Sequence, residues 1–405
     1  YEISLGLVGS EMCIRDRSRG DLNLFPPTQG GSVKIFNTVK YLSLLGNTVY
    51  FVTSEHDVYF EVKNGEWKKK EYPKSLSRKV FLKKSWKKIL SFLGVPEEEH
   101  VLFHPLFNHS LFLKALYVAK KEKVDLLHAE FLCFAFPLLL VKSLIGRKLV
   151  LVEHNVECKR MEEIFKLNIF TKTLLRSLES VITNLSDVVI VVTEEDKRRL
   201  EKLLVKRSKI HVVPHGVDVE RFERGNGERI KEKLRLSSPV IIFHGVLYYK
   251  PNADAVDRIA EIASEVKKHL PEASFLIVGE KPPTLKLHEN LIYTGVVKNL
   301  EDYIGAADIA IVPLKAGGGM RMKILEYFAA KKPVISTPKG AEGIDVESGR
   351  EIILCSIEDF PSKIVELWKN VDLRESIAKN AFEFVKKLHW RNICKKYVNL
   401  YRRLL

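Results

Sequence analysis

Short runs of branched and apolar residues alternate with helical stretches along most of this chain. In the first half, strand-like runs occupy residues 48–53, 124–128, 148–153, 187–193 and 209–213. A second series follows at residues 239–243, 274–278, 291–294, 308–312, 333–336 and 351–355. Strands that alternate with helices pair in parallel and form doubly wound sheets. The sequence therefore predicts an α/β protein built from two such sheets.

Helical periodicity fills the intervals between these runs. Ile35, Val39 and Leu42 recur at helical spacing and predict a helix over 32–45. Further helices are expected at 252–269, 299–306, 319–331, 358–369, 373–387 and about 391–404. Two successive α/β units indicate two Rossmann-like domains facing each other, with a ligand at the carboxyl ends of the strands.

The order of these elements divides the 405 residues into domains. We expect an N-terminal Rossmann-like domain at 19–215, a polar interdomain linker at 216–238, a C-terminal Rossmann-like domain at 239–388 and a returning helix at 389–405. Residues 1–18 resemble a spurious translation of sequencing-adapter DNA, although Ile3 to Val8 could imitate a strand. This interpretation predicts a non-native tail and the loss of the native start with its first strand.

The composition of the chain indicates what kind of partner it binds and in what kind of compartment it lies. Lys and Arg total 66 against 51 Asp and Glu, and this net charge of +15 favours an anionic partner. The five cysteines are scattered without a Cys-x-x-Cys pair, so neither a structural zinc site nor a disulfide framework is expected. Such thiols are typical of a reducing cytosol. The longest apolar run, 131–141, is too short to span a bilayer, which takes about 20 residues.

The most informative segment runs from Pro313 to Gly343 and follows a predicted strand. Gly317, Gly318 and Gly319 allow a ligand to approach the backbone at the start of a helix, where the amides favour an anion. Arg321 and Lys323 follow and could neutralise a diphosphate. Glu326, further along the helix, could accept hydrogen bonds from a ribose. These residues together predict a nucleotide diphosphate site.

This segment resembles the donor-site motif of the retaining glycosyltransferases of family 4, which have the GT-B fold. The matching residues are Gly317, Gly318, Gly319, Arg321, Lys323, Glu326, Ala330, Pro333, Val334, Thr337, Gly340, Glu342 and Gly343. Many members carry a Glu eight positions before the second Glu, where this chain has Gly318. The resemblance is therefore to the branch with a Gly-Gly-Gly-x-Arg-x-Lys-x-x-Glu motif, in which backbone amides replace that carboxylate.

The resemblance extends over roughly residues 21–405 and implies further donor contacts. Gly245 would lie against the diphosphate, Lys250 would contact a phosphate, and Val296 lies where the family backbone meets the base. In the N-terminal half, Gly30 and Gly31 resemble the family's first loop, which faces the donor from the opposite side. These contacts would bind a nucleotide-sugar donor.

His154 ends a predicted strand and matches a histidine that the family places near the transferred sugar. The resemblance implies transfer of a sugar with retention to a glycan or lipid-linked acceptor. Arg321 and Lys323 would stabilise the charge on the leaving diphosphate. His154, Arg321 and Lys323 are thus the expected catalytic residues. No Asp-x-Asp motif occurs, so we expect no metal and no other cofactor.

Residues 63–88 hold 11 Lys or Arg and only two acids, with Trp67, Tyr72, Phe81 and Trp86 between them. One interpretation is an anionic membrane surface bound through residues 63–93, which would make the protein cytoplasmic and peripheral on the inner face of the membrane. The other is a solvated loop and helix face.

Two other functions remain open. A GT-B nucleotide-sugar epimerase would isomerise the sugar without an acceptor, and a catalytically silent protein would only bind the donor. Nucleic acid is not an expected partner, because no helix-turn-helix, zinc-finger or RNP pattern occurs. An NAD-dependent dehydrogenase is disfavoured, because no Gly-x-Gly-x-x-Gly follows a strand with an acid about 20 residues further on.

Overall fold

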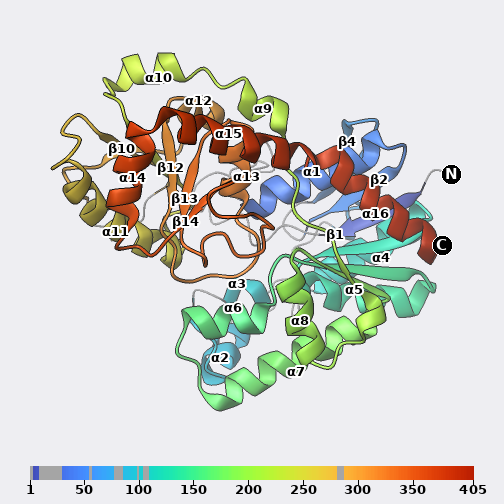
Figure 1. Cartoon of the computed structure of the whole chain (residues 1–405). Coiled ribbons are helices and arrows are strands. Elements are labelled where there is room, and N and C mark those ends of the chain that lie inside the picture. The colour runs from blue at the N-terminus through green and yellow to red at the C-terminus, as the bar shows by residue number, and fades with distance from the viewer. Residues whose placement is uncertain are drawn as a thin grey trace. The chain divides into compact units, whose positions relative to one another are not determined.

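The computed structural model describes residues 3–8, 30–53, 57–76, 85–97, 100–103, 109–280 and 287–405. The chain forms two compact units (Figure 1). The first comprises Tyr1–Pro214 with Trp390–Leu405, and the second comprises His215–His389. Each unit is an α/β domain around a mainly parallel sheet, so the expected fold class is confirmed. The segment expected as a linker carries α9 (Val219–Glu223) and α10 (Gly227–Leu234) and belongs to the second unit.

The N-terminal unit contains an eight-stranded sheet in the order β4-β3-β2-β1-β5-β6-β7-β8. Its strands are β1 (Ser4–Val8), β2 (Thr48–Val52), β3 (Val58–Lys63), β4 (Glu66–Glu71), β5 (Leu126–Glu130), β6 (Lys148–Glu153), β7 (Val188–Val191) and β8 (Ile210–Val212). The neighbouring strands are parallel in the pairs β2–β1, β1–β5, β5–β6, β6–β7 and β7–β8. The helices between them are α1 (Gly30–Leu44), α2 (Ser85–Phe92), α3 (His100–Phe103), α4 (His109–Lys121), α5 (Leu132–Ile145), α6 (Glu157–Ile164), α7 (Ile169–Leu185) and α8 (Glu194–Lys202).

Strand β1 lies in the middle of this sheet, within the segment that we expected to stand outside the fold. It pairs in parallel with both β2 and β5, and Leu5 is fully buried. The Asp125 carboxylate accepts the Ser4 N–H at 3.0 Å, which fixes where the strand begins. Whatever the origin of residues 1–18, Ser4–Val8 occupies the first-strand place that was expected to be empty.

The lysine-rich segment begins with a hairpin that the sequence analysis did not predict. Strands β3 and β4 are antiparallel and are joined by Asn64 and Gly65, which both have positive φ. Trp67 stacks on Phe36, with ring centres 5.3 Å apart, and Tyr72 is buried. Tyr72 therefore belongs to the core and Trp67 is half-buried, whereas Phe81 and the Trp86 side chain lie outside the described residues.

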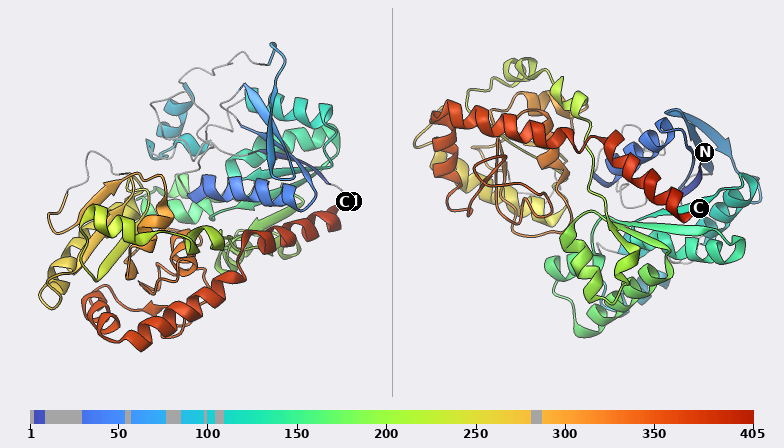
Figure 2. Two further views of the ribbon diagram at one scale, coloured as in Figure 1. Left: turned by 90° about the horizontal axis from the view of Figure 1, so that it is seen from above. Right: turned by 45° about the vertical axis from the view of Figure 1, so that its right-hand side comes forward.

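The chain ends in a helix that returns to the N-terminal unit. Helix α16 (Trp390–Leu404) packs beside α1 (Figure 2). Its apolar face is almost wholly buried, with Trp390, Tyr397 and Tyr401 at 1% exposure or less. The returning helix expected from the sequence thus contributes side chains to the core of the first unit.

The C-terminal unit has a six-stranded, fully parallel sheet in the order β11-β10-β9-β12-β13-β14. The strands are β9 (Val240–His244), β10 (Ser274–Val278), β11 (Ile292–Gly295), β12 (Ile309–Val312), β13 (Val334–Ser336) and β14 (Ile353–Leu354). The connecting helices are α11 (Lys250–Val266), α12 (Leu300–Gly305), α13 (Met322–Ala329), α14 (Phe360–Lys369) and α15 (Val371–Lys386). Since β9 and β12 are adjacent in the sheet, the segments that follow them lie at one edge.

We predict that Leu5→Ala lowers the free energy of unfolding of the N-terminal unit by about 2–5 kcal/mol, because it opens a cavity in the middle of the sheet. Urea unfolding followed by tryptophan fluorescence measures this, since three of the four tryptophans belong to that unit. Leu113→Ala is the control, because Leu113 is 42% exposed on α4 and should cost about 1 kcal/mol or less. Equal costs for both changes would contradict the central place of β1.

Candidate functional site

The segments that follow strands β9, β10 and β11 are joined backbone to backbone at one edge of the second sheet. The Gly245 N–H donates to the Val278 carbonyl at 2.9 Å, and the Gly279 N–H donates to the Gly295 carbonyl at 3.0 Å. A Cβ on Gly279 would lie 1.9 Å from the Gly245 carbonyl oxygen, so only glycine permits this approach. Val296, the expected contact with the base, follows Gly295 and is 61% exposed.

The three glycines of the motif lie between β12 and α13. Arg321 is the N-cap residue of α13, so the helix starts slightly later than predicted. The guanidinium folds back on the glycine turn and donates from Nη1 to the carbonyls of Gly318 and Gly319, the latter at 2.8 Å. A Cβ on Gly317 would lie 3.0 Å from both Arg321 Nη2 and the Tyr249 hydroxyl. Glycine at 317 therefore leaves room for the arginine beside the turn.

Lys323 reaches from α13 toward the segment that follows β9. Its Nζ donates to Asn252 Oδ1 at 3.0 Å and lies 3.9 Å from the centre of the Phe243 ring. A Cβ on Gly245 would be 3.0 Å from the same nitrogen. Burial, followed by the charge of Arg321, lowers the pKa of Lys323 to about 7. Two neighbouring cations in a partly desolvated setting favour a bound anion.

Glu326 is buried on the same helix and is held by a histidine. His244 Nε2 donates to Glu326 Oε2 at 2.7 Å. The Tyr327 hydroxyl donates to His244 Nδ1 at 2.8 Å and accepts the His244 backbone N–H at 3.0 Å. Burial lowers the pKa of His244, so the ring is neutral at pH 7. Glu326 Oε1 makes no hydrogen bond to a described residue and is the oxygen that could accept from a ribose.

The structure gives fewer contacts for the other expected donor-binding residues, Lys250, Gly30 and Gly31. Lys250 is exposed at the first position of α11. Gly30 and Gly31 begin α1 in the N-terminal unit, and the loop before them lies outside the described residues.

His154, directly after β6 in the N-terminal unit, belongs to a buried polar cluster. Its Nε2 lies 2.6 Å from Glu130 Oε2, at the end of the neighbouring strand β5. His128 Nε2 lies 3.1 Å from Glu130 Oε1, and Lys34 Nζ lies 3.3 Å from Oε2. Tyr401 of α16 closes the cluster, with its hydroxyl 2.6 Å from His128 Nδ1. One carboxylate thus accepts from three side chains.

Phe131 covers one face of the His154 ring. The ring centres are 3.8 Å apart and the planes differ by 26°. Phe131 has φ 73° and ψ 148°, which L side chains rarely adopt, and such backbone strain of about 1–3 kcal/mol concentrates at functional sites. Burial, followed by the charge of Lys34, lowers the pKa of His154 to about 4. His154 is therefore neutral at pH 7.

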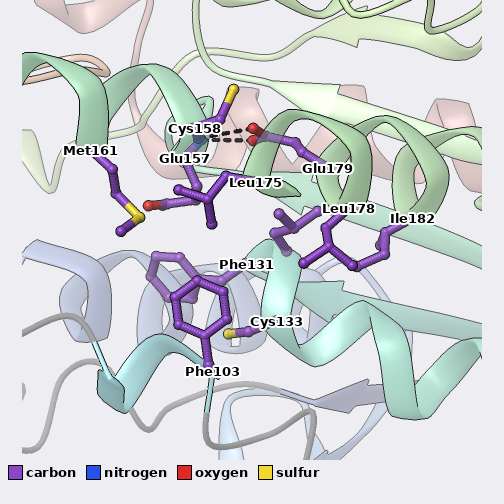
Figure 3. A pocket seen from close by; sticks show the side chains of 11 residues that line it. Phe103, Phe131, Cys133, Glu157, Cys158, Met161, Leu175, Leu178, Glu179 and Ile182 are labelled. Carbon is purple, nitrogen blue, oxygen red and sulfur yellow. Dashed lines mark hydrogen bonds between the residues drawn. The ribbon is translucent and has the colours of Figure 1, made fainter. Parts of the chain in front are cut away.

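A small cavity of about 40 Å³ lies behind Phe131 (Figure 3). In Figure 3, Phe103 and Cys133 lie with Phe131 on one side, and Leu175, Leu178 and Ile182 of α7 lie opposite. Its polar wall is Glu179, which accepts the backbone N–H groups of Glu157 at 2.6 Å and Cys158 at 2.9 Å. Glu179 thereby caps α6, because the N-cap residue Val156 has no side-chain acceptor.

The described residues contain neither a metal-binding group of side chains nor a membrane-spanning helix. Across the described ranges, no three His, Cys, Asp or Glu side chains form a group that could hold a metal ion. Within the same ranges, no helix is both long and apolar enough to cross a bilayer.

Several residues of these sites were missed in the sequence. His244, Asn252 and Tyr327 support the motif, and the Asn252 side chain holds Lys323 and donates to the Val246 carbonyl at 2.9 Å. No sequence motif contains Lys34, Glu130 or His128. The one available signal was that Glu130 and His154 lie at the ends of β5 and β6, which are neighbours in the sheet.

Two protein-family models match the chain. Residues 28–221 match the model "Glycosyltransferase Family 4", and residues 238–370 match "Glycosyl transferases group 1". The first model contains Lys34, Glu130 and His154, and the second contains the glycine-rich motif from Gly317 to Glu326.

Several curated proteins are similar to the chain. An uncharacterised glycosyltransferase of Methanocaldococcus jannaschii is 27% identical over 64% of this chain and 69% of its own length. N-acetyl-alpha-D-glucosaminyl L-malate synthase of Bacillus anthracis is 22% identical over 94% of this chain and 95% of its own. An Escherichia coli UDP-Gal:alpha-D-GlcNAc-diphosphoundecaprenol alpha-1,3-galactosyltransferase is 26% identical over 62% of this chain and 68% of its own.

Solved structures share the fold across the whole chain. Sucrose-phosphate synthase from Thermosynechococcus elongatus superposes with a TM-score of 0.73 at 15% identity and covers 100% of this chain and 99% of its own. Anabaena HepE, in complex with UDP-glucose, has a TM-score of 0.69 at 13% identity and covers 99% of this chain and 100% of its own. The chain therefore carries a glycosyltransferase family 4 domain followed by a glycosyl transferases group 1 domain, and it has the GT-B fold.

Proposed function

We propose that the protein transfers a sugar from a nucleotide diphosphate sugar to a glycan or lipid-linked acceptor, with retention at the anomeric carbon and without a metal ion. The observation that carries this proposal is that two cations, Arg321 and Lys323, lie close together beside the glycine turn. Burial, followed by the charge of Arg321, lowers the pKa of Lys323. A bound diphosphate would offset the repulsion between the two cations and favour the charged form of Lys323.

The same geometry suits the departure of the nucleoside diphosphate. Negative charge grows on the phosphate as the bond to the sugar breaks, so Arg321 and Lys323 would stabilise the transition state more than the ground state. Glu326 Oε1 would accept from the ribose, and His244 would keep that carboxylate in place. The E. coli relative is named for a UDP-sugar and a diphosphoundecaprenol-linked acceptor, and the Anabaena structure contains UDP-glucose, which supports a donor and acceptor of these classes.

Arg321→Ala is expected to weaken binding of a nucleotide sugar by about 10- to 100-fold, because charged hydrogen bonds are worth about 1.5–3 kcal/mol. Calorimetric titration with UDP-, GDP- and ADP-sugars measures this effect and identifies the nucleotide. Lys363→Ala, which removes a surface lysine paired with Glu366 on α14, is the matched control. Binding that survives Arg321→Ala unchanged would remove the donor site from this motif.

Donor binding should weaken as pH rises above 7. Free Lys323 has a pKa of about 7, and a bound diphosphate favours its charged form, so binding takes up a proton. The affinity is then constant well below pH 7 and falls through pH 7–9. A nucleotide sugar suits this measurement, because its diphosphate diester does not titrate in that range. Lys323→Arg keeps the charge and should abolish the pH dependence; a slope that persists in this variant would exclude Lys323 as its source.

Product analysis separates the remaining functions. Donor and acceptor together should give a glycoside with the anomeric configuration of the donor, and the rate should not change with EDTA. A new sugar isomer formed from donor alone would indicate an epimerase. Saturable donor binding without any product, across a panel of acceptors, would indicate a binding protein.

We also propose that the N-terminal unit docks on an anionic membrane, but through α5 and α7 rather than the lysine-rich hairpin. Two apolar stripes on these helices flank a groove of about 910 Å³. The exposed apolar side chains of the stripes are Phe136, Leu140 and Leu144 on α5, and Phe170, Val181 and Leu185 on α7. Helix α2 adds Ile89 and Phe92, the latter 90% exposed. Patches of this kind mark interaction surfaces.

The charges around this face favour a lipid surface as its occupant. The charged residues of α2, α5 and α7 are Lys87, Lys88, Lys142, Lys172, Arg176 and Glu179. The single acid, Glu179, is fully buried, so every exposed charge on the three helices is positive. Lys142 pairs with Asp187, and Arg176 pairs with Glu162. Apolar side chains beside Lys88 and Lys172 suit an anionic bilayer, at about 1 kcal/mol per cation near the surface.

Leu140→Glu combined with Leu185→Glu should reduce binding to anionic vesicles by more than about tenfold. Each change removes an exposed apolar side chain whose burial in the bilayer would be worth about 1.5–3 kcal/mol. Sedimentation with phosphatidylcholine vesicles, alone or mixed with phosphatidylglycerol, measures the effect. Leu113→Glu on α4 controls for added charge, and Lys68→Glu with Lys69→Glu tests the hairpin. Loss of binding only in the hairpin variant would place the docking surface there instead.

A further inference from the structure

A chain of hydrogen bonds runs through the N-terminal unit from the last helix to His154. It connects the Tyr401 hydroxyl to His128 Nδ1 at 2.6 Å, His128 Nε2 to Glu130 at 3.1 Å, and Glu130 to His154 Nε2 at 2.6 Å. Lys34 Nζ joins at Glu130 from α1 at 3.3 Å. His128 and Glu130 are 0% exposed, Lys34 is 1% exposed and His154 is 6% exposed. The chain is therefore shielded from water along its length.

The direction of each bond follows from the charge on Glu130. Burial alone raises the pKa of a carboxyl group, but Lys34 and the two histidines hold the pKa of Glu130 well below its usual range. An ionised carboxylate only accepts hydrogen bonds, so Nε2 carries the proton in both His128 and His154. His128 Nδ1 then accepts from the Tyr401 hydroxyl. His154 Nδ1, in the same neutral form, can only accept.

The charge state of His154 follows from all groups that face it. Lys34 from α1 and His128 from β5 disfavour a second proton, whereas Glu130 favours one. From α16, Cys394, Tyr397 and Tyr401 surround Glu130, and burial raises the pKa of each, so they are neutral. Burial of His154 is the largest effect and opposes its protonation. Burial lowers the pKa of Lys34, whereas the charge of Glu130 and its hydrogen bond raise it.

We propose that Glu130 is a positioning residue that fixes His154 as a neutral ring with its proton on Nε2, so that Nδ1 serves as a hydrogen-bond acceptor toward a sugar hydroxyl. This role rests on the proposed transferase function, because it assigns the sugar as the partner of His154. Phe131 supports it from the side, since its strained backbone holds its ring against His154. Stabilisation of the leaving diphosphate is thereby left to Arg321 and Lys323.

The tautomer can be measured without any substrate. Proton–nitrogen correlation spectra of histidine-labelled protein distinguish Nδ1–H, Nε2–H and charged rings, and His154→Gln identifies the signal. We expect wild-type His154 to be the neutral Nε2–H form from pH 6 to 8. A charged ring or an Nδ1–H form at pH 7 would overturn the proposal, whatever the variants show.

Two variants separate the roles of charge and acceptor. Lys34→Met retains the Glu130 acceptor, so His154 should keep Nε2–H and take up a second proton at higher pH than in the wild type. Lys34→Met with Glu130→Leu removes the acceptor and both charges, a change that buried ion pairs often tolerate. His154 should then populate both neutral tautomers. A single Nε2–H form in the double variant would show that Glu130 does not set the tautomer.

Kinetics with a nucleotide sugar then test the role in transfer. The double variant should lower kcat by about 10- to 100-fold, as loss of a partner that orients a functional histidine does, while the donor dissociation constant changes little. Tyr401→Phe, which removes only the donor to His128, is the control and should leave the His154 tautomer and kcat near the wild type. An unchanged kcat in a double variant with mixed tautomers would refute the role in transfer. If the wild type shows no transfer at all, the proposed function fails, and the spectra still decide whether Glu130 positions His154.

Discussion

A buried hydrogen bond between a histidine and a glutamate lies at the carboxyl ends of the strands in each unit. In the first unit Glu130 holds His154, and in the second Glu326 holds His244. Parallel strands bring their carboxyl ends to one edge, where the chain leaves the sheet and polar groups become available. In both units burial lowers the pKa of the histidine, so the ring is neutral at pH 7.

The two edges nevertheless have different electrostatics. In the N-terminal unit Lys34 balances Glu130 within hydrogen-bond distance, and the cluster needs no external ion. In the C-terminal unit burial, followed by the charge of Arg321, lowers the pKa of Lys323 to about 7. The first edge is thus suited to uncharged hydroxyl groups and the second to phosphates.

The sequence predicted what depends on contiguous residues. The β-branched runs predicted β6 and β10 with the observed bounds. Arg321 and Lys323 could be singled out because they lie within a few residues of the glycine turn. The hairpin β3–β4 was missed because its lysines were interpreted as a surface, although Asn64-Gly65 is a strong turn signal. The cluster around Glu130 could not be predicted, since Lys34 lies 96 residues away along the chain and only the folded sheet brings the two together.

The buried Lys34–Glu130 pair is better explained by function than by stability. Removing two charges from water costs several kcal/mol per ion, and apolar residues of the same volume often give an equally stable fold. The pair is also accompanied by two histidines and a strained Phe131, which add further cost. A core selected for stability alone would hold none of these groups. Their common effect is to fix the orientation and protonation of one side chain, His154, for which we propose a contact with the sugar.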